Sequence, residues 1–393
     1  MKKTLLPLLI ILYIFIPIIK IQAIEINSEH AILYNLNDDK IIYEKNAYEK
    51  IKIASLTKIM TTIIALENIE NIKEKTTMPK DALIGLEGYV TTEIKPNDII
   101  TYEDLLYGIM LPSGADCANA IAIKVSGNVE NFVELMNQKA KELNLTNTHF
   151  SNPIGIDDNN YSSVYDISIL LKYALKNKEF YKIFTTKEYT TTNNIKLEST
   201  LIEKSSPYNI DTSLILGSKT GFTDEAGNCL ASISKQNGVN YLLVTAHAPI
   251  EYPYHIVDAQ NTYNYYKENY SYKKILEFNK PIKTIKIKGS IKKQYEIKSE
   301  NDIYLFLNNE IDTNKLTYEY EGIEEITKDI KQNDKIGTLN IKYNNDTIFT
   351  HDILLNENIT FYNLKLYILS LIIVLIITLL LKLERKINKN KNW

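Results

Sequence analysis

The spacing of apolar residues changes along the chain, and the change predicts two folded regions of different secondary structure. Residues 30–45 alternate as a β-hairpin does, with a polar turn at residues 37–39. Apolar residues at helical spacing then predict helices at 54–66, 101–110, 118–125, 129–143 and 166–175. From residue 214 the pattern indicates strands at 218–221, 229–234 and 241–246. This mixture predicts a sheet with helices at its sides.

At about Tyr272 the pattern becomes one of short strands with period two. They are predicted at residues 282–287, 303–307, 316–320, 336–343 and 347–355, with a hairpin turn at 344–346. Regular short strands with polar turns predict a small β-sandwich over residues 273–360. It has no cluster of chemically reactive residues, so we interpret it as a spacer that lifts the first domain off a membrane.

Two apolar segments concern membranes. Residues 4–19 follow two lysines and precede Ala23, which predicts a secretory signal peptide over residues 1–23. An uncleaved anchor is the alternative. Near the other end, residues 366–381 carry no charge and predict a transmembrane helix over residues 363–382, with a buried core helix as the alternative. The basic tail 383–393 then lies in the cytoplasm and the main body outside the cell, because positive residues stay inside.

Composition narrows the function. The chain of 393 residues has 45 basic and 48 acidic residues, which argues against a nucleic-acid-binding protein. Cys117 and Cys229 fall in the exported part, where one disulfide and two free thiols are equally compatible with the sequence. There is no Cys-x-x-Cys or His-Glu-x-x-His motif, so we expect no zinc enzyme, no catalytic metal and no cofactor.

The strongest candidate for chemistry is the segment Ala54-Ser55-Leu56-Thr57-Lys58. Ser55 and Lys58 are one helical turn apart, so their side chains share a face. A lysine kept from water near another cation loses proton affinity and can take the proton of a serine nucleophile. Ser-x-x-Lys also occurs at 232–235, 271–274 and 290–293, so spacing alone is weak. It gains weight from Pro112-Ser113-Gly114 and the single Lys-Thr-Gly at 219–221, because Ser-x-x-Lys, Ser-x-Asn and Lys-Thr-Gly together are typical of penicillin-binding proteins and serine β-lactamases.

With its flanking residues, this set resembles the serine-type D-alanyl-D-alanine carboxypeptidases, the low-molecular-mass penicillin-binding proteins of peptidase family S11. The resemblance is strong over residues 28–260 and rests on the nucleophile segment and on four further segments: Glu103-Asp104-Leu105-Leu106-Tyr107-Gly108, Leu111-Pro112-Ser113-Gly114, Asn147 to Gly155, and Lys219 to Gly227. It implies an α/β (α+β) β-lactamase/transpeptidase-like catalytic domain over residues 24–272, with an antiparallel sheet flanked by helices. A small all-β sandwich domain and a C-terminal transmembrane helix would follow.

The resemblance also implies roles for residues. Ser55 would attack the D-Ala-D-Ala bond of a peptidoglycan stem peptide and form an acyl-enzyme, with Lys58 as the base and Ser113 as a proton relay. Lys219 would lie near both and keep Lys58 neutral by charge repulsion. Thr220 would bind the substrate carboxylate, Gly221 would let the peptide lie along its strand, and the N–H groups of Ser55 and Phe222 would form the oxyanion hole. β-Lactams would acylate Ser55 as covalent inhibitors.

Two positions depart from the family pattern. Ala115 stands where the second motif often has Asn, so Lys58 lacks one hydrogen-bond partner; Ser126-Gly127-Asn128 fits the letters of the motif, but its flanks do not match. For the nearby Asp116 and Asn119 we expect capping or surface roles. Some relatives bind the substrate carboxylate with an arginine upstream of Lys-Thr-Gly. Because its only arginine is Arg385, this chain has no such arginine. Lys204 can replace it as a point charge, and a plain surface lysine is the alternative.

Two other functions remain open. A serine β-lactamase would need a deacylating base, commonly in a Glu-x-x-Leu-Asn stretch, and the sequence has none. A catalytically weak peptidoglycan-binding or sensor protein is compatible with Ala115 and the membrane anchor. A Ser-His-Asp hydrolase is disfavoured because there is no Gly-x-Ser-x-Gly elbow. The sequence does not decide between cleavage of a terminal D-alanine and cleavage of a cross-link.

Overall fold

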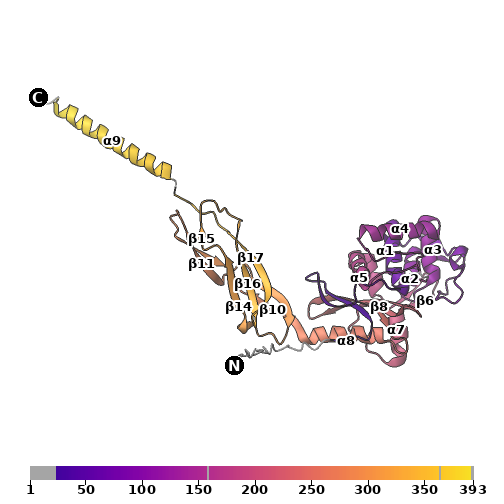
Figure 1. Ribbon diagram of the computed structural model, residues 1–393. Helices are drawn as coiled ribbons and strands as arrows, with labels where there is room; N and C mark the ends of the chain where they lie inside the picture. Colours follow the sequence, from indigo (N-terminus) through magenta and orange to yellow (C-terminus); the bar gives the residue numbers. More distant parts are fainter. Residues whose placement is uncertain (1–23, 157–158, 363, 391–393) are drawn as a thin grey trace, which may run out of the picture. The chain divides into compact units, whose positions relative to one another are not determined.

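The computed structural model describes residues 24–156, 159–362 and 364–390 (Figure 1). The predicted signal peptide, residues 1–23, lies outside the described residues. The chain divides into two compact units between Glu268 and Asn269, close to the boundary that the change of pattern near Tyr272 suggests.

The first unit is built on a five-stranded antiparallel sheet with the order β2-β1-β9-β8-β7. Its strands are β1 (His30–Asn35), β2 (Lys40–Lys45), β7 (Gly217–Thr223), β8 (Gly227–Gln236) and β9 (Val239–Ala248). Two short hairpin-like sheets pair β3 (Lys75–Thr77) with β4 (Ile99–Thr101) and β5 (Glu188–Thr190) with β6 (Lys196–Glu198). The expected sheet is confirmed, and the Lys-Thr-Gly strand β7 forms one of its edges.

Helices cover both faces of this sheet. They are α1 (Lys58–Asn68), α2 (Tyr102–Met110), α3 (Ala115–Ser126), α4 (Val129–Glu142), α5 (Val164–Ala174), α6 (Lys178–Thr185), α7 (Thr200–Ser205) and α8 (Tyr254–Asn269), with 3₁₀ turns η1 (Ala54–Thr57), η2 (Lys80–Leu83) and η3 (Ser206–Tyr208). Figure 1 shows α1 to α5 on one side of the sheet and α8 on the other. Every predicted helix exists, while the apolar pattern does not indicate α6, α7 or α8.

The two faces of the sheet pack differently. On the face toward α1 to α5, alternate strand residues such as Ile32, Leu242 and Val244 join one large apolar core with the almost wholly buried α1. On the other face α8 makes both polar and aromatic contacts with the strands. The Tyr263 hydroxyl lies 2.9 Å from that of Ser232, and the Tyr263 ring packs on Tyr241 of β9. Burial on both faces explains why β1 is buried along its whole length.

The second unit contains short strands around a separate apolar core, which confirms the expected small all-β region. Its three sheets have the orders β10-β13, β12-β11-β15 and β14-β16-β17. The strands are β10 (Tyr270–Leu276), β11 (Pro281–Ile287), β12 (Gln294–Lys298), β13 (Ile303–Asn308), β14 (Thr317–Gly322), β15 (Glu325–Ile326), β16 (Lys335–Tyr343) and β17 (Asp346–Leu354), with the 3₁₀ turn η4 (Thr313–Lys315).

The chain ends in helix α9 (Leu364–Asn390). Among the described residues it is the one helix long and apolar enough to cross a membrane, over the 22 residues Lys365–Lys386. The predicted span 363–382 falls within α9 except for residue 363, which is outside the described part.

Candidate active site

Ser55 lies in the 3₁₀ turn η1, directly before α1 begins at Lys58. The sequence pattern predicts a continuous helix here, and the difference has a local cause: Ala54 has a φ of 45°, which an α-helix cannot contain. The turn keeps both side chains on one side all the same, because Lys58 Nζ donates a hydrogen bond of 3.1 Å to Ser55 Oγ. The predicted pairing of serine and lysine therefore exists.

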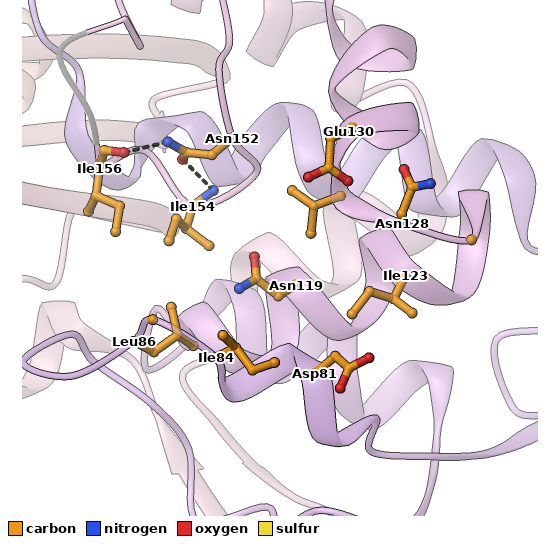
Figure 2. A pocket seen from close by; sticks show the side chains of 13 residues that line it. Asp81, Ile84, Leu86, Asn119, Ile123, Asn128, Glu130, Asn152, Ile154 and Ile156 are labelled. Carbon is orange, nitrogen blue, oxygen red and sulfur yellow. Dashed lines mark hydrogen bonds between the residues drawn. The ribbon is translucent and has the colours of Figure 1, made fainter.

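The ammonium group of Lys58 has a second hydrogen-bond partner, which the sequence motifs do not predict. Nζ donates a 2.8 Å hydrogen bond to the main-chain carbonyl of Ile154. Figure 2 shows how Asn152 shapes this loop: its Oδ1 accepts from the N–H group of Ile154, at 3.1 Å, and its amide donates to the carbonyl of Ile156. The same Oδ1 also accepts from the N–H group of Gly155 at 2.8 Å. The same loop borders a cavity of about 510 Å³ toward α3 and α4. Lys58 thus donates one hydrogen bond to a main-chain oxygen, whereas Ala115 has no side-chain amide that could accept one.

Both lysines of the site are buried, and burial changes their acidity. Lys58 is 2 % exposed and Lys219 is 1 % exposed. Desolvation lowers the pKa of Lys58 to about 7, against an opposing attraction from Asp116. The pKa of Lys219 is lowered well below its ordinary value, first by burial and then by repulsion from Lys58 and Lys204. Burial is therefore the leading cause for both lysines, and charge repulsion adds to it at Lys219.

Strand β7 passes directly beside the Ser55 turn. A Cβ added to Gly221 would lie 3.1 Å from the Ser55 nitrogen and 3.2 Å from the Ile53 oxygen, so only glycine fits comfortably. The next residue, Phe222, is an exposed part of the same edge strand. Among the described strands β7 pairs only with β8, so its other edge has no strand partner, which the addition of an extended peptide requires. The main-chain nitrogens of Ser55 and Phe222 thus belong to two segments that meet at this edge.

Ser113 occupies a tight junction between α2 and α3, as its sequence context predicts. It has a φ of 68°, and the turn is fixed by a 2.8 Å hydrogen bond from the Gly114 N–H to the Gly108 carbonyl. Of the expected capping or surface roles for Asp116 and Asn119, the surface roles are wrong, because both side chains are buried. Asp116 accepts hydrogen bonds from the Thr92 N–H and hydroxyl, and the Asn119 amide donates to the Ala82 carbonyl at 3.3 Å.

Helix α7 lies against β7 and contributes Lys204. The hydroxyls of Thr200 and Thr220 are 2.6 Å apart, which joins the two elements beside Lys219. Lys204 Nζ lies 5.7 Å from the centre of the Phe222 ring, and burial lowers its pKa. The sequence leaves two roles for Lys204, a point charge at the site and a plain surface lysine. Its position favours the first, since its charge also acts on Lys219.

The remaining candidates have structural roles. Ser126 and Asn128 stand at the junction of α3 and α4, where Asn128 caps α4 by accepting from the Asn131 N–H at 2.7 Å. This supports our interpretation that Ser-Gly-Asn at 126–128 is not the second motif. Cys117 and Cys229 are both free and buried, which decides the question of a disulfide left open by the sequence.

An antiparallel sheet that carries Lys-Thr-Gly on its edge strand, next to a Ser-x-x-Lys turn, defines the penicillin-binding protein/transpeptidase-like class of fold. A family model described as D-alanyl-D-alanine carboxypeptidase matches residues 18–249, and one described as Penicillin-binding protein 5, C-terminal domain, matches residues 270–360. The chain therefore belongs to the D-alanyl-D-alanine carboxypeptidase family of penicillin-binding proteins. Membership confirms the resemblance and makes the chain a hydrolase of a family that binds peptidoglycan peptides and β-lactams.

Individual relatives agree with this assignment. The chain is 28 % identical over 327 residues to D-alanyl-D-alanine carboxypeptidase DacF of Bacillus subtilis, covering 82 % of this chain and 83 % of that protein. It is 33 % identical over 238 residues to D-alanyl-D-alanine carboxypeptidase DacC of Escherichia coli, covering 58 % of each. The structure of penicillin-binding protein 5 from Haemophilus influenzae aligns with a TM-score of 0.65 at 24 % identity, covering 85 % of this chain and 98 % of that one, which supports the fold.

Proposed function

We propose that the chain is a serine-type D-alanyl-D-alanine carboxypeptidase that uses Ser55 as its nucleophile. The observation that carries this proposal is the 3.1 Å contact from Lys58 Nζ to Ser55 Oγ, beside the open edge of β7. Neutral Lys58 takes the Ser55 proton, and Oγ forms a bond to the carbonyl carbon of the penultimate D-alanine. The N–H groups of Ser55 and Phe222 stabilise the resulting oxyanion.

The second half of the reaction breaks the peptide bond. Ser113 relays the proton that Lys58 took from Ser55 to the nitrogen of the terminal D-alanine, which leaves as the free amino acid. An acyl ester remains on Ser55, and Lys58 is neutral again. Water then adds to the ester carbonyl and gives up a proton to Lys58, and the ester bond breaks to restore the Ser55 hydroxyl. A β-lactam enters the same first step but has no leaving group that can depart, so it stays bound.

The proposed substrate is a peptidoglycan stem pentapeptide that pairs with the edge of β7. Its terminal carboxylate binds near Lys219 and Thr220, with Lys204 as an additional point charge. The position of Lys204 supports this role, because its charge acts on Lys219 and burial lowers the pKa of both lysines. A carboxylate bound beside them would raise both pKa values again and favour the charged forms that hold it. Gly221 supports the placement because the absence of a side chain lets β7 pass close to the Ser55 turn.

We further propose that the catalytic unit acts outside the cytoplasm on a chain anchored by α9. The apolar stretch Lys365–Lys386 and the family membership support attachment to the cell membrane. Basic residues after the span favour a cytoplasmic C-terminus. A signal peptide at residues 1–23 completes this topology.

The decisive variant is Ser55→Ala in the full-length protein, kept in detergent. We expect it to release no D-alanine from a defined pentapeptide, measured by mass spectrometry, and to resist labelling by a fluorescent penicillin. Offering a cross-linked peptide dimer in parallel distinguishes removal of the terminal D-alanine from cleavage of cross-links.

The matched control is Ser271→Ala, which removes a serine from a second Ser-x-x-Lys sequence in the C-terminal unit. It should behave like the unmodified chain in both assays. Release of D-alanine or penicillin labelling by Ser55→Ala would refute Ser55 as the nucleophile. Rapid hydrolysis of the bound penicillin by the unmodified chain would instead favour a β-lactamase.

A further inference from the structure

A cluster of side chains that could ligate a metal lies in the first unit, in segments that the proposed chemistry does not use. Glu29, His30 and His247 each present one ligand atom, and these atoms all lie within 4.8 Å of one another. Glu29 and His30 stand at the start of β1, and His247 stands near the end of β9, which pairs with β1. The cluster therefore joins two neighbouring strands of the main sheet.

His30 has one ring nitrogen engaged in a hydrogen bond and the other available. Its ring is buried, and Nδ1 lies 2.9 Å from the main-chain carbonyl of Asn46. A carbonyl oxygen only accepts, so Nδ1 carries the proton and Nε2 keeps its lone pair. A hydrogen bond from the second ring nitrogen to a backbone carbonyl is a typical support of a metal-binding histidine.

His247 is aimed at this position by an irregularity in its strand. Asn228 pairs with Ala248 and Leu230 pairs with Thr245, so residues 246 and 247 of β9 oppose the single residue 229 of β8. His247 has a φ of 54° in this bulge. Bulges re-aim side chains, and a non-glycine residue in the left-handed region is locally strained. The bulge places the imidazole of His247 edge-on to that of His30, with the ring centres 5.1 Å apart.

One nitrogen of the His247 ring has no hydrogen-bond partner in the described part of the chain, and the other faces Glu29. Nε2 of His247 is buried and has no hydrogen-bond partner among the described residues. The Glu29 carboxylate approaches the other nitrogen, Nδ1, at 3.7 Å, which is too long for a hydrogen bond. The Glu29 side chain is 70 % exposed, so it can move by the small amount that coordination requires.

We propose that Glu29, His30 and His247 bind a zinc ion that ties the start of β1 to the end of β9. Two imidazoles and one carboxylate suit Zn²⁺, whereas Mg²⁺ and Ca²⁺ prefer sites made of oxygen alone. In a tetrahedral zinc site the ligand atoms lie about 3.4 Å apart, from bonds of about 2.1 Å. Rotation of the exposed Glu29 side chain and a small shift of the rings close the present spacing to that value.

The role of this ion is structural. The segment before β1 is already fastened to α8, since Asp258 accepts hydrogen bonds from the N–H and hydroxyl of Ser28 at 2.8 and 2.6 Å. The Glu29 N–H also donates to the His247 carbonyl at 3.4 Å. A zinc ion adds a cross-link at the same place, so it raises the thermal stability of the first unit without entering the reaction at Ser55.

The test is a calorimetric titration of untagged, chelator-treated full-length protein in detergent with ZnCl₂, with MgCl₂ as a second titrant. We expect one zinc site, no heat of binding for Mg²⁺, and an unfolding midpoint that rises with ZnCl₂. His247→Asn should weaken zinc binding by more than about tenfold, since even the loss of an outer-shell partner costs that much. Asparagine tolerates the left-handed backbone of this position, so the bulge is retained.

Glu29→Gln is a second variant, which changes only an exposed side chain and should also weaken binding. His351→Asn is the matched control, because it removes an exposed histidine from the second unit and should bind zinc normally. The proposal is overturned if the unmodified chain takes up no zinc, or if His247→Asn and Glu29→Gln bind it as well as His351→Asn does. Because these readouts do not depend on Ser55, they are independent of the proposed peptidase activity.

Discussion

The two site lysines of the first unit and the surface lysines of the second unit lie in opposite environments. In the first unit Lys58 and Lys219 are buried, and their ammonium groups donate to a hydroxyl and to main-chain carbonyls. In the second unit, lysines lie on the surface against carboxylates, as in Lys283–Glu324 at 3.3 Å and Lys335–Asp352 at 2.6 Å. Burial and neutral hydrogen-bond partners therefore distinguish Lys58 and Lys219 from lysines on a solvated surface.

The direction of the pKa shift follows from this difference. Burial lowers the pKa of Lys58 to about 7, whereas the hydrogen bond to Glu319 raises the pKa of Lys342. A surface lysine with an acidic neighbour stays charged and cannot accept a proton at neutral pH. A buried lysine without a direct carboxylate partner is able to do so.

The repeated Ser-x-x-Lys sequences make the same comparison in geometric terms. Ser271 and Lys274 lie on strand β10, where residues three apart point to opposite faces. Lys274 Nζ pairs with Asp302 at 2.8 Å, and the Ser271 hydroxyl donates to the Asn309 side chain at 2.6 Å. The spacing pairs a serine with a lysine only where the backbone turns helically, as it does from Ser55 to Lys58.

The largest effect expected from this comparison is that of Lys58→Ala. Loss of the base should slow acylation of Ser55 by a fluorescent penicillin by about 10²–10⁴-fold, followed in a stopped-flow instrument. Circular dichroism should show a retained fold, because removal of a buried ammonium group also removes its desolvation cost. Lys274→Ala, the exposed counterpart in the second unit, should be acylated at the normal rate. Near-normal acylation of Lys58→Ala would exclude this residue as the base.

A smaller loss is expected for Gly221→Ala. The new methyl group would meet the Ser55 nitrogen at 3.1 Å, so the turn or β7 must shift by a few tenths of an ångström. Displacement of reacting groups lowers rates steeply, and we expect acylation to fall by about 10- to 100-fold with little change in stability. The control Gly238→Ala lies in the β8–β9 hairpin with a φ of +81° and open space around it. It should cost about 1 kcal/mol of stability and leave acylation unchanged, which is the reverse pattern. Equal acylation rates in the two variants would contradict the close approach of β7 to Ser55.

The pH dependence tests the lowered pKa of Lys58 itself. Only the neutral amine accepts the Ser55 proton, so acylation should be slow in acid, rise with pH and be half-maximal near pH 7. Asp116 raises the pKa of Lys58, and Asp116→Asn should therefore move this acidic limb to lower pH. Glu324→Gln, beside an exposed lysine of the second unit, should leave the profile in place. An acidic limb that does not move in Asp116→Asn would remove Asp116 as an influence on the base.

The sequence predicts the parts of this site whose signal is local. Period-two and helical patterns locate β1, β2, β7, β8, β9 and helices α1 to α5, and the short motifs locate Ser55, Ser113 and Lys219. Each of these signals comes from neighbouring residues, and each motif stands at the end of an element whose pattern is clear. The family resemblance then supplies the expectation that three distant segments meet.

Other features leave no such local signal. Helix α8 buries one face at helical spacing, but that face includes His255, Asp258 and Thr262, so no apolar stripe exists. The carbonyl of Ile154 is a backbone atom, and its approach to Lys58 depends on the loop that Asn152 holds. The only advance sign of this loop is its Asn-Pro and Gly turn chemistry. The 3₁₀ turn at Ser55 likewise depends on tertiary packing, since it lies against β7 and the loop at Gly155. This loop comes so close that a Cβ on Gly155 would clash with the Ala54 carbonyl.

The smallest expected effect belongs to the surface lysines of the second unit. Lys283 Nζ lies 3.3 Å from a Glu324 carboxylate oxygen, and the side chains are 42 % and 72 % exposed. Water screens such a pair and ordering two long side chains costs entropy, so Lys283→Ala should change the free energy of unfolding by less than about 1 kcal/mol. Penicillin acylation should be unchanged, since no proton passes through this residue. A loss of acylation in Lys283→Ala, with the chain still folded by circular dichroism, would show that the second unit contributes more to the reaction than a support does.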